Sequence, residues 1–169
     1  DSLFVDPYVT DNDPTDAMVG SGHGVHTAGT IAAQADNGIG MTGVAPDASL
    51  MALRVCVDPG CPWSAQIEAA NYASANGARV ANLSIAGMGF EFAEPLLNEA
   101  FAANPDVLFV IAAGNDYNDN DSVPTYPCVW DPSGAGGIDN VVCVAATDVD
   151  DTLAGFSSWG ATTVDIAAP

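Results

Sequence analysis

The sequence predicts an α/β protein with a mostly parallel sheet and helices on both faces. Two observations carry this prediction. Apolar runs of the length of fully buried strands alternate along the chain with segments of helical periodicity. Such alternation is typical of parallel strands joined by crossover helices. The length of 169 residues suits one domain with a sizeable core, so we expect residues 1–169 to belong to a single domain.

The elements of the N-terminal part are expected in the following order. Residues 1–21 are acidic and rich in turn-forming residues, which indicates a surface loop. Small and apolar residues from Gly24 to about Gln34 indicate a buried helix, with His23 at or near its first turn. Residues 48–55 (ASLMALRV) are predicted to form a strand.

We expect two further helices and three further strands in the C-terminal part. The expected helices are residues 64–76, with Gly77 as the stop signal, and residues 95–103, beginning a little before Pro95. The expected strands are residues 79–85, 107–113 and 140–146.

Ligands of such sheets bind at the carboxyl ends of the strands. Residues 84–87, residues 113–116 and the segment after Ala146 follow predicted strands and suit this role. Residues 116–137 are polar and rich in proline and glycine, so we expect a surface loop pinned by Cys128.

The charge balance excludes several classes of partner. Two basic residues oppose 22 acidic ones, and the formal net charge is −20. With no basic footprint to neutralise phosphates, we expect no binding to nucleic acid or to an anionic membrane. The longest apolar run is far shorter than the roughly 20 residues of a membrane-spanning helix. The acidity fits an acidic secreted enzyme, a saline habitat that screens the repulsion, or bound divalent cations.

The four cysteines indicate an oxidising compartment. An Asp-Pro-Gly turn between Cys56 and Cys61 brings these two residues together, so we expect the disulfides Cys56–Cys61 and Cys128–Cys143. Disulfides are typical of secreted proteins. The alternatives are a zinc site, although no Cys-x-x-Cys knuckle is present, and free thiols in a cytosolic protein.

Both histidines lie in residues 21–33 (SGHGVHTAGTIAA). A metal shared by His23 and His26 needs at least one further ligand, and Gly24 stands where a helical zinc pair usually has glutamate. A general base needs exposure at a pocket, and Gly22 and Gly24 allow another group to approach the His23 ring. On this stretch alone, a base and a pair of structural histidines both stay open.

An observation outside this stretch favours the general base. The apolar run 107–113 ends in Gly114-Asn115, and an asparagine at a strand end can present its NH2 group to a developing oxyanion. An ordinary turn residue is the alternative for Asn115.

Several motifs in the same order resemble those of the subtilisin-like serine peptidases (subtilases, peptidase family S8). The segments are GHGVHTAGT at 22–30, GVAP at 43–46, NLSIA at 82–86, AAGN at 112–115, FSSWG at 156–160 and VDIAAP at 164–169. The resemblance covers essentially all of residues 20–169. It implies a three-layer subtilisin-like catalytic domain, incomplete at both ends, and hydrolysis of peptide bonds in proteins.

The resemblance assigns catalytic roles to two residues. His23 would be the general base that takes a proton from a serine hydroxyl and returns it to the leaving amine. Asn115 would donate to the oxyanion of the tetrahedral intermediate. His26, one helical turn after His23, would point back into the structure and be structural.

The resemblance also implies a binding site for an extended polypeptide. One segment would pair with the substrate by main-chain hydrogen bonds, and a second would line the pocket for the residue before the scissile bond. The first consists of Ser84, Ile85 and Ala86, and the second of Ala112, Ala113 and Gly114. Small uncharged walls suggest a preference for apolar or aromatic side chains. We expect a monomer.

Two family motifs are missing from the 169 residues. Asp1-Ser2-Leu3 lacks the glycine of the catalytic D-[ST]-G motif, and its distance to His23 is short. No G-T-S-M-A nucleophile motif occurs, and Ser157 and Ser158 belong to an earlier motif. We therefore expect these 169 residues alone to be inactive.

Residues 35–41 (ADNGIGM) resemble the calcium loop of the family. The implied ligands are the side-chain oxygen of Asn37 and the carbonyls of Ala35, Ile39 and Met41, with a carboxylate from upstream of the histidine. A plain Asn-Gly turn is the alternative.

Two rival functions stay open beside the peptidase. A non-catalytic pseudo-protease would keep the fold for binding, although His23 and Asn115 argue against it. A metal-dependent hydrolase would require a third ligand beside His23 and His26.

Overall fold

The structure is a computed structural model that describes residues 14, 22–56, 60–88, 94–129 and 138–169. The chain divides into two compact units, Asp1–Ala65 and Gln66–Pro169. Apart from Pro14, the expected N-terminal loop lies outside the described residues. The expectation of a single domain stays a prediction.

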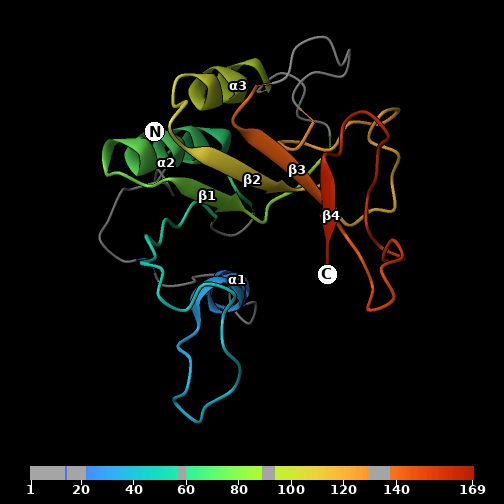
Figure 1. The fold of residues 1–169 in the computed structure, drawn as a ribbon. Coiled ribbons are helices and arrows are strands. Elements are labelled where there is room, and N and C mark those ends of the chain that lie inside the picture. Colours follow the sequence, from blue (N-terminus) through green and yellow to red (C-terminus); the bar gives the residue numbers. More distant parts are fainter. Residues whose placement is uncertain (1–13, 15–21, 57–59, 89–93, 130–137) are drawn as a thin grey trace, which may run out of the picture. The chain divides into compact units, whose positions relative to one another are not determined.

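A parallel sheet forms the centre of the unit Gln66–Pro169 (Figure 1). Its strands are β1 (Val80–Leu83), β2 (Leu108–Ala112), β3 (Val141–Ala146) and β4 (Ile166–Ala168), in the order β1-β2-β3-β4. All three neighbouring pairs are parallel. The α/β class and the first three strands are confirmed. The strand β4 was not predicted, because three residues are too few to show a period.

Two predicted helices are present, α2 (Trp63–Ala75) and α3 (Glu94–Ala102). The chain leaves α2 where Gly77 adopts a φ of 80°, a left-handed conformation that suits glycine. The Ala78 N–H donates to the Ala73 carbonyl at 2.9 Å, which satisfies one of the last carbonyls of the helix. Gly77 therefore ends α2, as predicted from the sequence.

The sheet buries one of its faces. Phe109, Ile111 and Cys143 point to this face and are 0% exposed. The ring of Phe101 in α3 lies 4.4 Å from the ring of Phe109, measured between centroids. The helices α2 and α3 lie side by side. The Asn104 side chain, just after α3, donates to the side chain of Asn71 in α2 at 2.8 Å. The apolar contact of Phe101 with Phe109 belongs to the core of the unit.

The other face of the sheet is only half-buried, as Val110, Val142 and Val144 show. Within Gln66–Pro169, the described residues include no helix that buries this face. The second helical layer of the expected fold therefore stays a prediction.

One side-chain amide joins α3 to the start of β3. Asn140 Nδ2 donates to the carbonyls of Phe101, Asn104 and Val107 at 3.0, 3.0 and 2.9 Å. The Phe101 carbonyl lies in the last turn of α3, and Asn140 gives it a donor in addition to the Asn104 N–H. This amide lies at the amino end of β3, opposite the edge where ligands of such sheets bind.

The unit Asp1–Ala65 contains α1 (His23–Ala32), the predicted histidine helix. The N–H groups of residues 43–45 donate to carbonyls at the C-terminal end of α1 at 2.8–3.0 Å. A Cβ on Gly43 would lie 2.5 Å from the main-chain nitrogen of Ala32. This close approach explains why the Gly-Val-Ala-Pro segment begins with glycine.

Two expectations for this unit are wrong. Residues 48–55 form no strand, and Leu50 and Met51 are 50% and 40% exposed. A strand needs a neighbour for its main-chain groups, and no described residue pairs with this segment. The helix α1 was expected to be buried, but none of its residues is buried.

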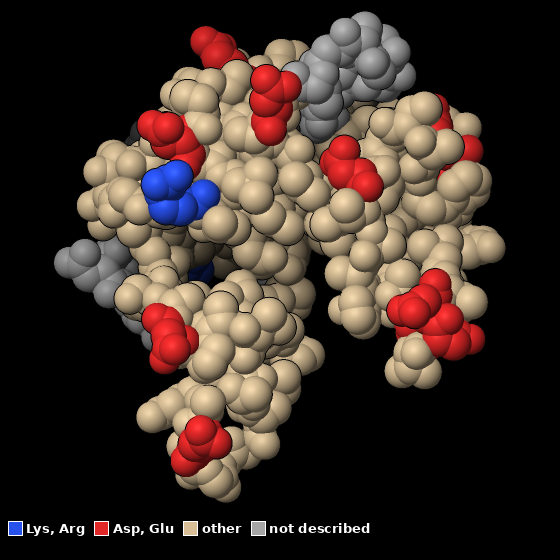
Figure 2. Space-filling view, viewed as in Figure 1, with Lys and Arg blue, Asp and Glu red and all other residues tan. Residues whose placement is uncertain are grey.

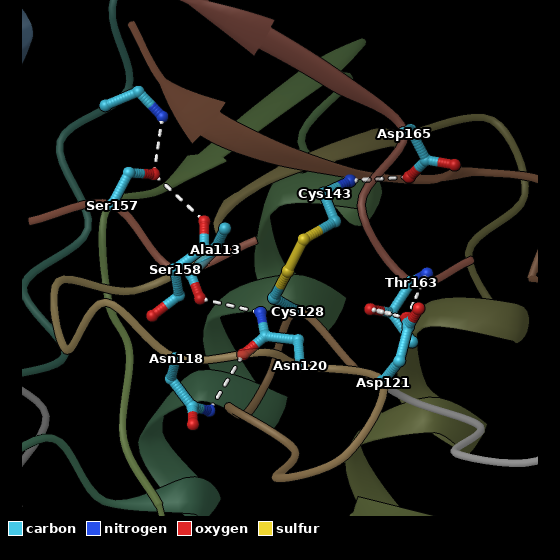
Figure 3. The surroundings of a disulfide bond; sticks show 11 residues. Ala113, Asn118, Asn120, Asp121, Cys128, Cys143, Ser157, Ser158, Thr163 and Asp165 are labelled. Carbon is cyan, nitrogen blue, oxygen red and sulfur yellow. Dashed lines mark hydrogen bonds between the residues drawn. A yellow bond between two sulfur atoms is a disulfide. The ribbon is translucent and has the colours of Figure 1, made fainter. Parts of the chain in front are cut away.

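Both predicted disulfides are present, Cys56–Cys61 and Cys128–Cys143. The second joins the loop after β2 to the middle of β3, with 5.2 Å between its Cα atoms (Figure 3). Cys128 and Cys143 are both 0% exposed. Residues 125–129 are buried with them, so the expected surface loop 116–137 is wrong for this part. Residues 130–137 lie outside the described residues.

We expect replacement of Cys128 and Cys143 by alanine to lower the free energy of unfolding by about 3 kcal/mol. The bond closes a loop of about 15 residues, and the loss follows from the entropy that the unfolded chain regains. Urea unfolding of the double variant measures it. Cys56 and Cys61 close a much shorter loop, so their replacement should cost about 2 kcal/mol. A larger loss for this second pair would contradict the prediction.

Candidate active site

The carboxyl edge of the sheet brings two predicted substrate segments together. Leu83 of β1 is in register with Ile111 of β2 in a parallel pair. Residues 84–86 and residues 112–115 therefore leave adjacent strands at the same edge. This is the edge at which ligands of parallel sheets bind.

The segment Ser84–Ala86 continues β1, which lies at an end of the strand order. Ser84 and Ile85 are half-buried, and Ala86 is exposed. After them, Gly87 and Tyr126 exchange two antiparallel main-chain hydrogen bonds, of 2.9 and 2.8 Å. The segment is thus held at both of its ends, and an extended peptide could pair with its main chain.

The segment Ala112–Asn115 ends β2 with a sharp change of conformation. Gly114 has a φ of 110°, and a Cβ there would lie 2.9 Å from Thr125 Cγ2 and 3.1 Å from Ser158 Oγ. Only glycine fits, for both conformation and space. Ala113 and Gly114 are buried and Ala112 is half-buried, whereas Asn115 is exposed. Asn115 is thus open to a substrate at the end of a buried segment.

Buried polar side chains surround this segment (Figure 3). Asn120 Nδ2 donates to the Ala113 carbonyl at 2.9 Å. The Ser158 N–H donates to the Gly114 carbonyl at 2.9 Å. Asn120 and Ser158 are 0% exposed. Neither residue was predicted to belong to the site. The Phe-Ser-Ser-x-Gly motif was an available signal for Ser158, and Asn120 had none.

In the acidic run 116–121, the side chain of Asp121 is held by several hydrogen bonds. Asp121 accepts hydrogen bonds from the Thr163 hydroxyl at 2.7 Å, the Thr162 hydroxyl at 2.9 Å and the Ala161 N–H at 2.8 Å. These bonds, led by that of Thr163, hold the pKa of the Asp121 carboxyl below its ordinary value. Their stabilisation is present at neutral pH and is lost as the pH falls through the lowered pKa.

Acidic side chains are spread over the visible face of the molecule (Figure 2). In the part of the chain that the structure describes, no three His, Cys, Asp or Glu side chains are placed to hold a metal ion. Within that part, no third ligand joins the two histidines, so the structure gives no support to a zinc hydrolase.

His23 is the first residue of α1, as predicted, and follows Gly22, whose φ is 53°. Its side chain is exposed. His26 is also exposed, so the expectation that it points back into the structure is wrong. The hydrogen bond from its N–H to the Gly22 carbonyl, 2.9 Å long, belongs to the first turn of the helix.

The expected calcium loop follows α1 with three left-handed residues. Asp36, Gly38 and Gly40 have φ values of 56°, 72° and 59°. Asn37 Oδ1 accepts the N–H of Ile39 at 2.9 Å. An amide oxygen has a second lone pair, so this bond leaves it able to bind a cation. The amide and carbonyl oxygens of the loop fit the ligand chemistry of calcium.

The whole chain matches one protein family. The profile of the subtilase family covers residues 1–169. The chain belongs to the subtilase family. It is 38% identical over 161 residues to thermitase of Thermoactinomyces vulgaris, and the match covers 94% of this chain and 52% of that protein. The thermophilic serine proteinase of Bacillus sp. strain AK1 is 37% identical over 169 residues, which are 98% of this chain and 37% of the relative.

A solved protease structure agrees with the fold. The epidermin leader peptide processing serine protease of Staphylococcus aureus gives a TM-score of 0.70 at 24% identity, covering 84% of this chain and 38% of that chain. The chain spans about half or less of the length of each of these three relatives.

Proposed function

We propose that this subtilase is a serine endopeptidase that hydrolyses peptide bonds of proteins, and that residues 1–169 form part of its catalytic domain. One observation carries the proposal: Asn115 is exposed at the carboxyl end of β2, beside the edge segment Ser84–Ala86. A hydrogen-bond donor next to a peptide-binding edge is the arrangement that acyl transfer requires.

In the proposed reaction, a serine hydroxyl attacks the scissile carbonyl carbon and its proton passes to His23. The carbonyl oxygen becomes an oxyanion, and Asn115 Nδ2 donates a hydrogen bond to it. His23 then gives the proton to the leaving amine as the C–N bond breaks, which leaves an acyl-enzyme for water to hydrolyse. His23 and Asn115 belong to different units, so family membership supports their joint role.

The substrate would bind as an extended strand beside residues 84–86. The side chain before the scissile bond would lie against Ala112, Ala113 and Gly114. These residues carry no charge, which supports a preference for apolar or aromatic side chains. Thr125 and Ser158 pack against Gly114 and limit the space there.

A peptidase assay tests the proposal. We expect the complete gene product to cleave an unfolded protein substrate and to lose activity with a serine-directed inhibitor. The separate 169-residue chain, which contains no nucleophile motif of the family, should be inactive. A gene product that binds peptides without cleaving them would instead be the pseudo-protease. Cleavage that a metal chelator stops and the inhibitor does not affect would contradict the serine mechanism.

We also propose that the protein is secreted and acts as a monomer. The two disulfides support secretion, since such bonds persist in oxidising compartments. The described residues contain no helix that is long and apolar enough to cross a membrane.

Calcium at residues 35–41 is a further part of the proposal. We expect removal of calcium by a chelator to lower the melting temperature of the complete gene product, because a ligand that binds the folded state stabilises it. Asn37→Ala removes one proposed ligand and should abolish most of this calcium effect. Asn76→Ala, which alters an exposed amide after α2, is the matched control. An unchanged melting temperature after chelation would contradict a site in this loop.

A further inference from the structure

The Ser157-Ser158 pair of the Phe-Ser-Ser-x-Gly motif has no role in the reaction proposed above. Together with Asn120 it forms a buried group, here called the polar clamp, and its three members are at most 1% exposed. The clamp lies at the carboxyl ends of β2 and β3 (Figure 3). Buried polar groups are costly unless their hydrogen bonds are satisfied, so the contacts of the clamp indicate what it holds.

On the β2 side, the clamp holds the residues that flank Asn115. The carbonyl of Ala113 accepts from Asn120 Nδ2 at 2.9 Å, and the carbonyl of Gly114 accepts from the Ser158 N–H at 2.9 Å. Ser158 Oγ accepts the N–H of Asp116 at 3.4 Å. Bonds therefore reach the main chain on both sides of Asn115, and none of them involves its side chain.

On the β3 side, the clamp is anchored to the sheet. Ser157 Oγ accepts the N–H of Ala146, the last residue of β3, at 2.9 Å and donates to the Ser158 carbonyl at 2.9 Å. The Asn120 N–H donates to the Trp159 carbonyl at 2.6 Å. The group that holds the Asn115 segment is thus itself bound to a strand and to the 157–159 segment.

We propose that Asn120 and Ser158 are positioning residues that fix the main chain of residues 113–116 and thereby aim the amide of Asn115 at the oxyanion. Such positioning is needed because Gly114, next to Asn115, has a φ of 110°. Glycine restricts its own backbone dihedrals less than any other residue, so the neighbouring main chain must be held by other groups. A donor to an oxyanion works only when it is held in place before the reaction. The inference rests on the proposed function.

The kinetic test uses Asn120→Ala in the complete gene product, alone and combined with Asn115→Ala. We expect Asn120→Ala alone to lower kcat about tenfold and to leave KM within about twofold, because misplacing a catalytic group acts on the transition state. In the Asn115→Ala background, the same change should lower kcat less than about twofold, because the donor that it positions is gone.

Asn140→Ala is the matched control. Asn140 is also an asparagine whose amide donates to main-chain carbonyls, but it lies at the amino end of β3. It should lower the melting temperature while kcat changes less than about twofold. If Asn120→Ala does not fold, Ser158→Ala, which deletes one hydroxyl and keeps the main-chain bond to Gly114, replaces it.

A second measurement does not depend on turnover. Nitrogen-15 relaxation of the Gly114 and Asn115 amides should show lower order parameters in Asn120→Ala and unchanged ones in Asn140→Ala. Unchanged order parameters in Asn120→Ala, or equal kcat losses with and without Asn115, would overturn the inference. An Asn115→Ala variant with full kcat would instead refute the proposed role of Asn115, and the relaxation data would still decide whether the clamp orders its segment.

Discussion

Replacing Asn115 by alanine is expected to lower kcat for peptide hydrolysis by about a hundred- to a thousandfold. This magnitude is the known cost of removing one oxyanion donor, and it comes from a subtilisin, a member of the same family. The physical reason is that Asn115 Nδ2 would stabilise charge that exists on the carbonyl oxygen in the transition state and not in the ground state. KM should therefore change little.

Steady-state kinetics of the complete gene product would measure this loss. Asn140→Ala is the control, since its amide also donates to main-chain carbonyls but lies at the amino end of β3. It should cost far less in kcat than Asn115→Ala. A rise in KM without a fall in kcat would assign Asn115 to substrate binding alone and contradict the oxyanion role.

Replacing His23 by alanine is expected to lower kcat by about ten thousandfold or more. Without the imidazole, the serine hydroxyl has no base to take its proton and the leaving amine has no acid to protonate it. The melting temperature should change little, because His23 is an exposed residue at the start of α1.

The neighbouring histidine supplies the control for this variant. His26 is exposed on the same helix, and His26→Ala should keep kcat within about twofold. Equal losses for the two variants would point to a shared role, such as the binding of one metal ion. Full activity of His23→Ala would refute the proposed base.

Local sequence was sufficient to predict most helices and strands. The apolar run around Phe109 and the one around Cys143 have strand length and are β2 and β3. The helix before Gly77 ends where that glycine stops it. Each of these predictions depends on residues close together in the chain, which a sequence shows directly.

Predictions that depended on distant partners were less successful. Residues 48–55 have the composition of a strand, but no described residue pairs with them. Residues 125–129 look like part of a polar surface loop, but they are buried near the disulfide that joins Cys128 to β3. Periodicity describes one segment, whereas pairing and burial depend on what other segments supply.

The candidate site shows the same division. His23 and Asn115 could be proposed from the sequence, because they stand in short motifs with fixed neighbours. The proposed contribution of Asn120 to the site could not be predicted in this way, since an asparagine between aspartates is expected to be exposed to solvent. It depends on a hydrogen bond to Ala113, seven residues earlier, after the chain has turned back over the end of β2.

The sequence by itself determined the α/β class, three of the four strands, the cysteine pairs and the family. Only the tertiary structure decided the strand order, which places Ser84–Ala86 beside Ala112–Asn115, and the burial of the polar clamp that holds the second segment. The physical reason is the range of the interactions. Periodicity and turn chemistry act over a few residues, whereas strand pairing and buried hydrogen bonds join residues that meet only after the chain has folded.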